Sequence, residues 1–305
     1  MKHSLSITLI LVLIFFLSQL IGLYALSAST NVIRTPEGIV IEYENTTIGE
    51  RPDIHGWETF AYILVAVLIG TGLILLLVRF RKFSIWKGMF FFAVWMTCSI
   101  TIGVFIDSMA ALVICVFLAF FKVYRPNIWI HNLTELLIYA GIAVIFVPLL
   151  DIVWVTLLLL AISAYDMFAV WRSKHMISLA EFQTKSRAFA GIMLSYKVKP
   201  AKSAPKGKKK EEKEPKEETK NAILGGGDIA FPLIFAGVVM SSLLSSGIMT
   251  KPFAFLATLI IPLVVSLSLL SLLFFAKKDR YYPAMPFITV GCLAGYAIVW
   301  ATVFA

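Results

Sequence analysis

Two aspartates lie inside apolar stretches of the sequence, where a carboxylate is costly to keep. Asp166 occurs in the segment 164–167, and Asp228 follows three glycines in the segment 224–232. An ionised aspartate near the centre of a membrane helix costs about 2.5–3.5 kcal/mol on insertion scales. Since a chain that retains such a residue usually has a use for it, these two aspartates are the first candidates for chemistry.

Two facing carboxyl groups in a water-poor site cannot easily both ionise, so they share one proton. The ionised group can take a proton from a water that attacks a peptide carbonyl, while the protonated group polarises that carbonyl and then protonates the leaving nitrogen. This chemistry needs no metal and no other cofactor. Two alternatives stay open on the residues alone: proton relay in a proton-coupled transporter or ion-leak channel, and structural hydrogen bonds between helices.

The composition places these residues in a membrane protein. The chain has 305 residues, of which 59% are hydrophobic, whereas soluble domains are about 45–50% apolar. We therefore expect an all-α, polytopic membrane protein. The net charge of +9 is typical of basic cytoplasmic loops rather than of nucleic-acid binding. The three cysteines are far apart in apolar runs, and the four histidines form no H-E-x-x-H motif, so we expect no metal site.

Apolar segments predict nine transmembrane helices. The run 88–121 would be roughly 51 Å long as one helix, against an apolar bilayer core of about 30 Å, so it must turn, near Asp107. The run 136–171 must turn at Pro148 and Asp151 for the same reason. The first apolar segment, 5–26, could be a signal peptide, but its length of 22 residues is enough to cross the bilayer and favours a retained helix. The other expected helices cover about 57–78, 222–247, 252–276 and 284–305.

Charge placement predicts the orientation of these helices. The connections after the second, fourth, sixth and eighth helices are basic, and they contain Arg79, Arg81, Lys82, Lys87, Lys122, Arg125, the lysines of 197–220, Lys277, Lys278 and Arg280. The other connections hold only Arg34, Arg51 and Lys251. Because basic connections stay in the cytoplasm, we expect a cytoplasmic N-terminus and an outer C-terminus.

The longest connection separates the two aspartates. We divide the chain into residues 1–171 with six helices, a cytoplasmic connection over 172–220, and residues 221–305 with three helices. Within the connection, 176–182 resembles an interfacial helix and 188–194 a strand, whereas the Lys-, Glu- and Pro-rich part from about 197 should be disordered. A further short strand is expected at 38–43.

The predicted topology brings the two aspartates to similar depth. Asp166 lies six residues before Arg172, and Asp228 lies eight residues after Lys220, which are roughly 9 Å and 12 Å along their helices. We therefore expect the two carboxyl groups to meet. Asp107 and Asp151 fall at outer turns instead, where water reaches them and we expect ordinary turn or cap aspartates.

These residues resemble the motifs of one known family. Tyr165-Asp166 matches the YD motif of the presenilin and signal-peptide-peptidase family, and Gly225 to Asp228 matches its GxGD motif. Pro283-Ala284-Met285 resembles its PAL motif, with Met285 in place of leucine at similar volume. The cytoplasmic N-terminus and short termini are similar to an archaeal presenilin homologue.

The resemblance implies an intramembrane aspartyl endopeptidase of the cell membrane. Its substrates would be transmembrane segments or signal-peptide remnants within the lipid bilayer, with no nucleic acid, no evident obligate partner subunit and no cofactor or metal. Asp166 and Asp228 would be the catalytic pair. The residues lining the site or binding substrate would be Tyr165, Gly225, Gly226, Gly227, Pro283, Ala284 and Met285.

Two local features bear on substrate access. Pro232 removes the hydrogen bond back to the carbonyl of Asp228, so we expect a kink just beyond this acid. A substrate helix satisfies its own backbone hydrogen bonds and must unwind before hydrolysis. We therefore hypothesise that the strand-like part of 172–200 pairs with the unwound substrate.

Overall fold

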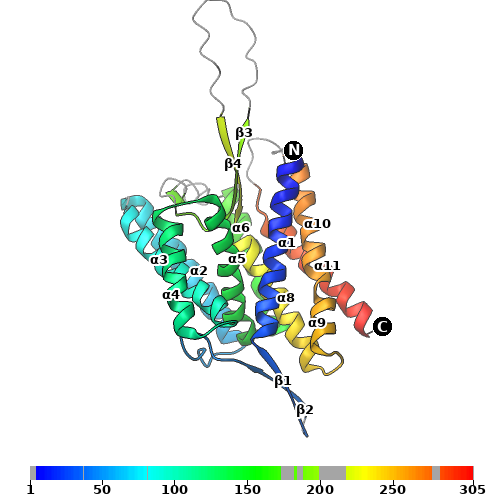
Figure 1. The fold of residues 1–305 in the computed structure, drawn as a ribbon. Helices are drawn as coiled ribbons and strands as arrows, with labels where there is room; N and C mark the ends of the chain where they lie inside the picture. The colour runs from blue at the N-terminus through cyan, green and yellow to red at the C-terminus, as the bar shows by residue number, and fades with distance from the viewer. Residues whose placement is uncertain are drawn as a thin grey trace, which may run out of the picture.

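The computed structural model describes residues 5–36, 38–80, 82–172, 182–183, 188–198, 218–276 and 282–304. Most of these residues are helical, and the helices pack side by side into one bundle (Figure 1). Within the described residues, eight helices are long and apolar enough to cross a membrane, and the apolar helix Ser108–Tyr124 is shorter. The polytopic helical fold is as expected.

Two sets of elements follow one another along the chain. The first set holds α1 (Leu5–Ala28), β1 (Thr30–Thr35), β2 (Gly38–Tyr43), α2 (Trp57–Phe80), α3 (Phe83–Gly103), α4 (Ser108–Tyr124), α5 (Ile128–Phe146), the 3-10 turn η1 (Val147–Leu149), α6 (Ile152–Met167) and the π-helical turn η2 (Phe168–Arg172). The second set holds β3 (Gly191–Val198), β4 (Glu218–Gly225), α8 (Gly227–Ser245), α9 (Lys251–Thr258), α10 (Ile260–Phe275) and α11 (Met285–Phe304).

Two antiparallel hairpins, β1–β2 and β3–β4, extend from the ends of the bundle. The N-terminus and the β3–β4 hairpin lie at one end, and the β1–β2 hairpin lies at the opposite end (Figure 1). The strand predicted at 38–43 is confirmed as β2, which pairs with β1. In the second hairpin Gly191 of β3 lies opposite Gly225 of β4. Strand β4 ends at Gly225 and α8 begins at Gly227, so the hairpin leads directly into α8.

The predicted turns in the two long apolar runs are confirmed. The Asp107 carboxylate accepts hydrogen bonds from the N–H groups of Met109 and Ala110 and caps α4. Asp151 caps α6 by accepting from Trp154 N–H at 3.0 Å. These bonds satisfy N–H groups that have no partner within their own helix, so both aspartates are helix caps.

Helix α8 is the centre of the bundle. Of the residues in its apolar window 72% are buried, against 11% for α2, and it contacts α1, α5, α6 and α11. Gly22 of α1 lies so close to Leu233 that a Cβ there would overlap the leucine side chain. The buried amide of Gln19 donates to the carbonyl of Ile229 at 3.0 Å. Helix α1 therefore packs against the central helix through buried contacts.

The region between α6 and α8 differs in part from the expectations. The helix predicted over about 222–247 begins only at Gly227, because 218–225 forms β4. The sequence predicts disorder from about 197 to 220, but residues 197–198 and 218–220 belong to β3 and β4; residues 199–217 lie outside the described part. The interfacial helix expected at 176–182 also falls almost entirely outside the described residues. The strand expected at 188–194 is observed, three residues later, as β3.

One charge prediction also needs correction. The sequence places Lys122 among the basic residues of a cytoplasmic connection, but it is 1% exposed and lies within α4. Its ammonium group pairs with Glu135 of α5 at 2.5 Å. The position of Lys122 just after an apolar run suggests a loop, but the residue remains inside the bundle because the carboxylate of Glu135, thirteen residues later, pairs with it.

The close approach of α3 and α5 generates a stability prediction. A Cβ on Gly141 of α5 would overlap the carbonyl oxygen of Thr97 in α3, whereas a Cβ on Gly88 of α3 would meet nothing within 4 Å. We expect Gly141→Ala to lower the free energy of unfolding by about 1–3 kcal/mol through overpacking. Gly88→Ala should instead raise it by about 0.5–1 kcal/mol by restricting the unfolded chain. Thermal unfolding in detergent measures both, and equal stabilities would contradict the packing.

Candidate active site

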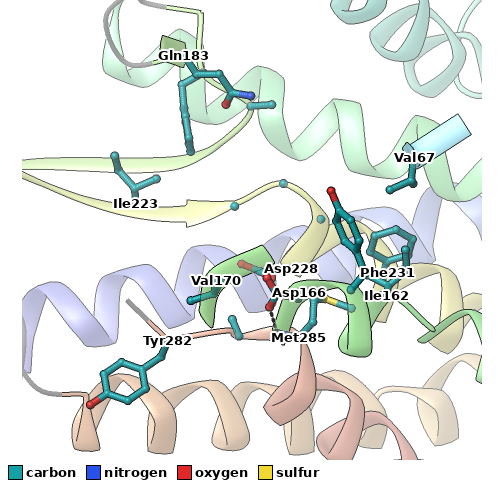
Figure 2. Close-up of a pocket in the computed structure, with 17 residues that line it drawn as sticks. Val67, Ile162, Asp166, Val170, Gln183, Ile223, Asp228, Phe231, Tyr282 and Met285 are labelled. Atoms are coloured by element: carbon teal, nitrogen blue, oxygen red, sulfur yellow. Dashed lines mark hydrogen bonds between the residues drawn. The ribbon is translucent and has the colours of Figure 1, made fainter. Parts of the chain in front are cut away.

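Asp166 lies one residue before the end of α6 and points toward the start of α11. The residue is 4% exposed, and its carboxyl group accepts a hydrogen bond from the backbone N–H of Met285 at 3.2 Å (Figure 2). The backbone of Ala284 supplies a second hydrogen bond. The PAL-like segment therefore holds this carboxyl group through main-chain donors, which do not depend on the identity of the side chains.

A hydrogen bond between side chains also holds α6 against α11, one turn away from this contact. The hydroxyl groups of Ser163 and Thr289 are 2.7 Å apart, and both residues are buried. Thr289 also bonds the carbonyl of Leu159. Because Ser163 precedes Asp166 by three residues, this pair fixes the distance between the helices that carry the acid and its donors.

Asp228 lies in the first turn of α8, where the hairpin strand β4 ends. Its carboxyl group accepts a hydrogen bond from the backbone N–H of Gly225. The N-terminus of a helix is also a favourable place for a negative charge, since the first N–H groups point toward it. The structure thus places both sequence-predicted aspartates beside backbone donors that can stabilise a carboxylate.

The two carboxyl groups meet in one cavity. Figure 2 shows Asp166 and Asp228 side by side, and they are close enough to interact electrostatically. The cavity has a volume of about 430 Å³. Besides the two aspartates, its lining includes Tyr165, Gly225, Gly226, Gly227, Ala284, Met285, Val67, Phe231 and Tyr282. Every sequence-predicted site residue except Pro283 therefore lines this cavity; Pro283 is buried next to Ala284.

The glycines before Asp228 differ in how much space surrounds them. A Cβ on Gly226 would lie 3.0 Å from the hydroxyl oxygen of Tyr139 in α5, and a Cβ on Gly225 would lie 3.2 Å from the Asp228 carboxylate. For Gly227 the nearest atom would be 3.5 Å away, which is an ordinary contact. Gly225 and Gly226 are therefore the two positions where a side chain would press on the site.

Tyr165 lines the cavity next to Asp166 and connects α6 to α2. Its hydroxyl donates a hydrogen bond to the hydroxyl of Thr71 at 3.1 Å. Four residues after Asp228, Pro232 lies inside α8, where it is buried. Because proline has no N–H, the carbonyl of Asp228 lacks its usual helical partner.

Sequence reasoning missed a set of polar residues behind the glycine segment. Glu135 and Tyr139 of α5 are buried at 0% and 2% exposure, and Tyr139 bonds Glu135. Glu135 also accepts the backbone N–H of Gly191 at 3.0 Å. The signal that could have revealed this set is Glu135 itself, an acidic residue followed directly by an apolar run, with Lys122 at the end of the preceding run.

Comparison with known proteins identifies one family. Residues 37–305 match the family described as signal-peptide peptidase, presenilin aspartyl protease. No curated protein sequence matches the chain by direct comparison. Nothing in these findings favours a transporter.

The solved structures that share the fold include two of presenilin-family intramembrane aspartate proteases. The first, in space group C222, has a TM-score of 0.57 and 18% identity, covering 97% of this chain and 99% of that one. The second, in space group P2, has a TM-score of 0.56 and 19% identity, with 96% of each chain covered. Since the family match spans most of the sequence, the chain belongs to the signal-peptide peptidase and presenilin aspartyl protease family.

Proposed function

We propose that Asp166 and Asp228 are the catalytic pair with which this intramembrane aspartyl protease hydrolyses peptide bonds in transmembrane segments. The observation that carries the proposal is that two carboxyl groups from different helices, α6 and α8, meet in one cavity within an apolar bundle. Both side chains are costly in this setting, and the fold supplies each with backbone donors.

The geometry supports general acid–base hydrolysis. The pair carries one proton, so one carboxylate accepts a proton from the attacking water while the other carboxylic acid hydrogen-bonds the substrate carbonyl. Collapse of the tetrahedral intermediate transfers a proton to the leaving nitrogen, and the pair regains its starting charge. The backbone N–H groups of Gly225 and Met285 hold the two carboxyl groups in place throughout.

The substrate class follows from the walls of the cavity. Apart from the two aspartates the lining is dominated by apolar side chains and glycine backbone, which suits a hydrophobic peptide, and the substrates would be transmembrane segments or signal-peptide remnants. Tyr165, Gly225, Gly226, Gly227, Ala284 and Met285 would contact the substrate, while Pro283 would shape the segment behind them.

An unwound substrate would pair with β4 rather than with β3, the strand that the sequence suggests. Alternate backbone groups of β3, at Gly191 and Met193, are occupied by side chains of α5. The opposite edge of the hairpin is β4, where Ile223 is 41% exposed and lines the cavity. The N–H of Gly226 bonds the carbonyl of Ala190, so these two residues form a hydrogen-bonded pair. Hydrogen-bonded and non-hydrogen-bonded pairs alternate along an antiparallel ladder. Ile223, opposite Met193, therefore falls in a non-hydrogen-bonded pair, and its N–H points away from β3.

We also propose a topology of nine transmembrane helices. Helix α4 (Ser108–Tyr124) would be the ninth span, at 17 residues, or roughly 25 Å. With the N-terminus and the 172–220 connection in the cytoplasm and the C-terminus outside, residues 1–171 and 221–305 would each contribute one aspartate from the cytoplasmic side. The bilayer would be the cell membrane.

The first prediction concerns the catalytic pair. Asp166→Asn and Asp228→Asn each remove a carboxyl group at nearly constant volume, so each should lower cleavage of a fluorogenic single-pass substrate by at least roughly 10³-fold. Elution on gel filtration should match the wild type. If either variant cleaves at the wild-type rate, that aspartate is not part of the pair.

The second prediction concerns the edge of β4. Ile223→Pro removes an N–H that points away from β3, so it should lower kcat/KM by about 10-fold while leaving the melting temperature close to that of wild type. Ile223→Ala is the control, because it removes the side chain but retains the N–H. Equal activity of the two variants would exclude pairing of the substrate at this position.

The third prediction concerns orientation. Glu50 and Arg125 are both exposed, and the three native cysteines are buried, so a membrane-impermeant maleimide should label only an introduced cysteine. Glu50→Cys should be labelled in intact cells, whereas Arg125→Cys should require permeabilised cells. The reverse pattern would invert the proposed topology.

A further inference from the structure

A buried ion pair lies between α4 and α5, outside the cavity of the two aspartates. Lys122 is 1% exposed and Glu135 is 0% exposed, and Lys122 Nζ lies 2.5 Å from Glu135 Oε1. The ammonium group also donates to the hydroxyl of Thr134 at 3.0 Å and to the carbonyl of His131 at 3.3 Å. A buried pair of this kind often adds little net stability compared with apolar residues, so its retention invites another explanation.

The other oxygen of Glu135 faces β3. Glu135 Oε2 accepts the backbone N–H of Gly191 at 3.0 Å and the hydroxyl of Tyr139. Lys122 therefore occupies one carboxylate oxygen, which leaves the second oriented toward the first residue of the strand. The ion pair thereby fixes the direction of a hydrogen-bond acceptor for the main chain of β3.

Two neighbouring side chains of α5 bind the same edge of β3. His131 Nε2 lies 2.8 Å from the carbonyl oxygen of Gly191. The amide of Asn132 accepts from Met193 N–H at 3.1 Å and donates to Met193 carbonyl at 2.9 Å. We call His131, Asn132 and Glu135 the α5 clamp. Together they satisfy four backbone groups of β3 that point away from β4.

The position of β3 determines the position of Asp228. Gly191 lies opposite Gly225 in the hairpin, and the N–H of Gly226 donates to the carbonyl of Ala190 at 3.2 Å. Gly225 in turn donates its N–H to the Asp228 carboxyl group. A short chain of main-chain contacts therefore connects the α5 clamp to the acid.

We propose that Glu135, oriented by Lys122 and acting with the rest of the α5 clamp, is a positioning residue that sets the β3–β4 hairpin and thereby the Asp228 carboxyl group. This inference rests on the proposed function of Asp228. Glu135 touches neither substrate nor reacting atoms; it acts through Gly191 and the glycine segment. Loss of its acceptor oxygen should leave Asp228 poorly aligned with Asp166.

Two neutral double variants separate positioning from charge burial. Lys122→Met with Glu135→Gln removes both charges but retains an acceptor for the N–H of Gly191. Lys122→Met with Glu135→Leu removes both charges and the acceptor. Since neither variant leaves an unpaired buried charge, a difference between them reports on the acceptor.

We expect the Gln double variant to retain most of the wild-type cleavage rate. The Leu double variant should lose about 10- to 100-fold in kcat, in line with a misplaced reacting group, with a much smaller change in KM. Hydrogen exchange of a peptide covering 188–198 should be faster in the Leu variant. The inference is overturned if the two variants share the same kcat and exchange rate.

A second variant tests the α5 clamp if the Leu double variant does not fold. Asn132 is only partly buried, so Asn132→Leu should fold while losing both bonds to Met193, and its kcat should fall with little change in KM. An unchanged kcat would also overturn the inference. Failure of the proposed function is distinguishable, because it would show as cleavage that survives Asp228→Asn in an otherwise wild-type chain.

Discussion

Carboxyl groups can be kept inside an apolar bundle only if hydrogen-bond donors meet them there, and for Asp166 and Asp228 the main chain supplies such donors. In lipid a polar group cannot turn to water for its hydrogen bonds, so the donors have to come from the protein. Asp166 receives them from Ala284 and from Met285, the first residue of α11, and Asp228 receives one from the end of β4. The N–H of Met285 is free because it belongs to the first turn of α11, and the N–H of Gly225 is free because it points away from β3.

This requirement explains the arrangement around the site. The strand before α8, β4, supplies the backbone of Gly225 next to Asp228. This strand is held in place by pairing with β3. Helix α8 occupies the centre of the bundle, so that its first turn reaches the end of α6. The buried tie between Ser163 and Thr289 then fixes α6 against α11.

Much of the fold and of the site could be predicted from the sequence, because both depend on the lengths of apolar runs and on charged residues that are costly to bury. The turns at Asp107 and Asp151, the hairpin strand at 38–43 and the meeting of Asp166 with Asp228 all followed from such rules. The start of α8 could not be predicted, since the apolar residues of 222–225 suit a strand as well as a helix. Burial of Lys122 was hidden because its partner, Glu135, lies on a different helix.

Gly226 illustrates how one close contact can couple a residue of the motif to a residue on another helix. A Cβ at 226 would lie 3.0 Å from the hydroxyl oxygen of Tyr139, which is a tight contact, and 3.5 Å from the carbonyl oxygen of Ala190, which is an ordinary one. A side chain at 226 therefore requires the ring of Tyr139 to move by a few tenths of an ångström. The residue before Gly227 and Asp228 is in this way coupled to the position of Tyr139 on α5.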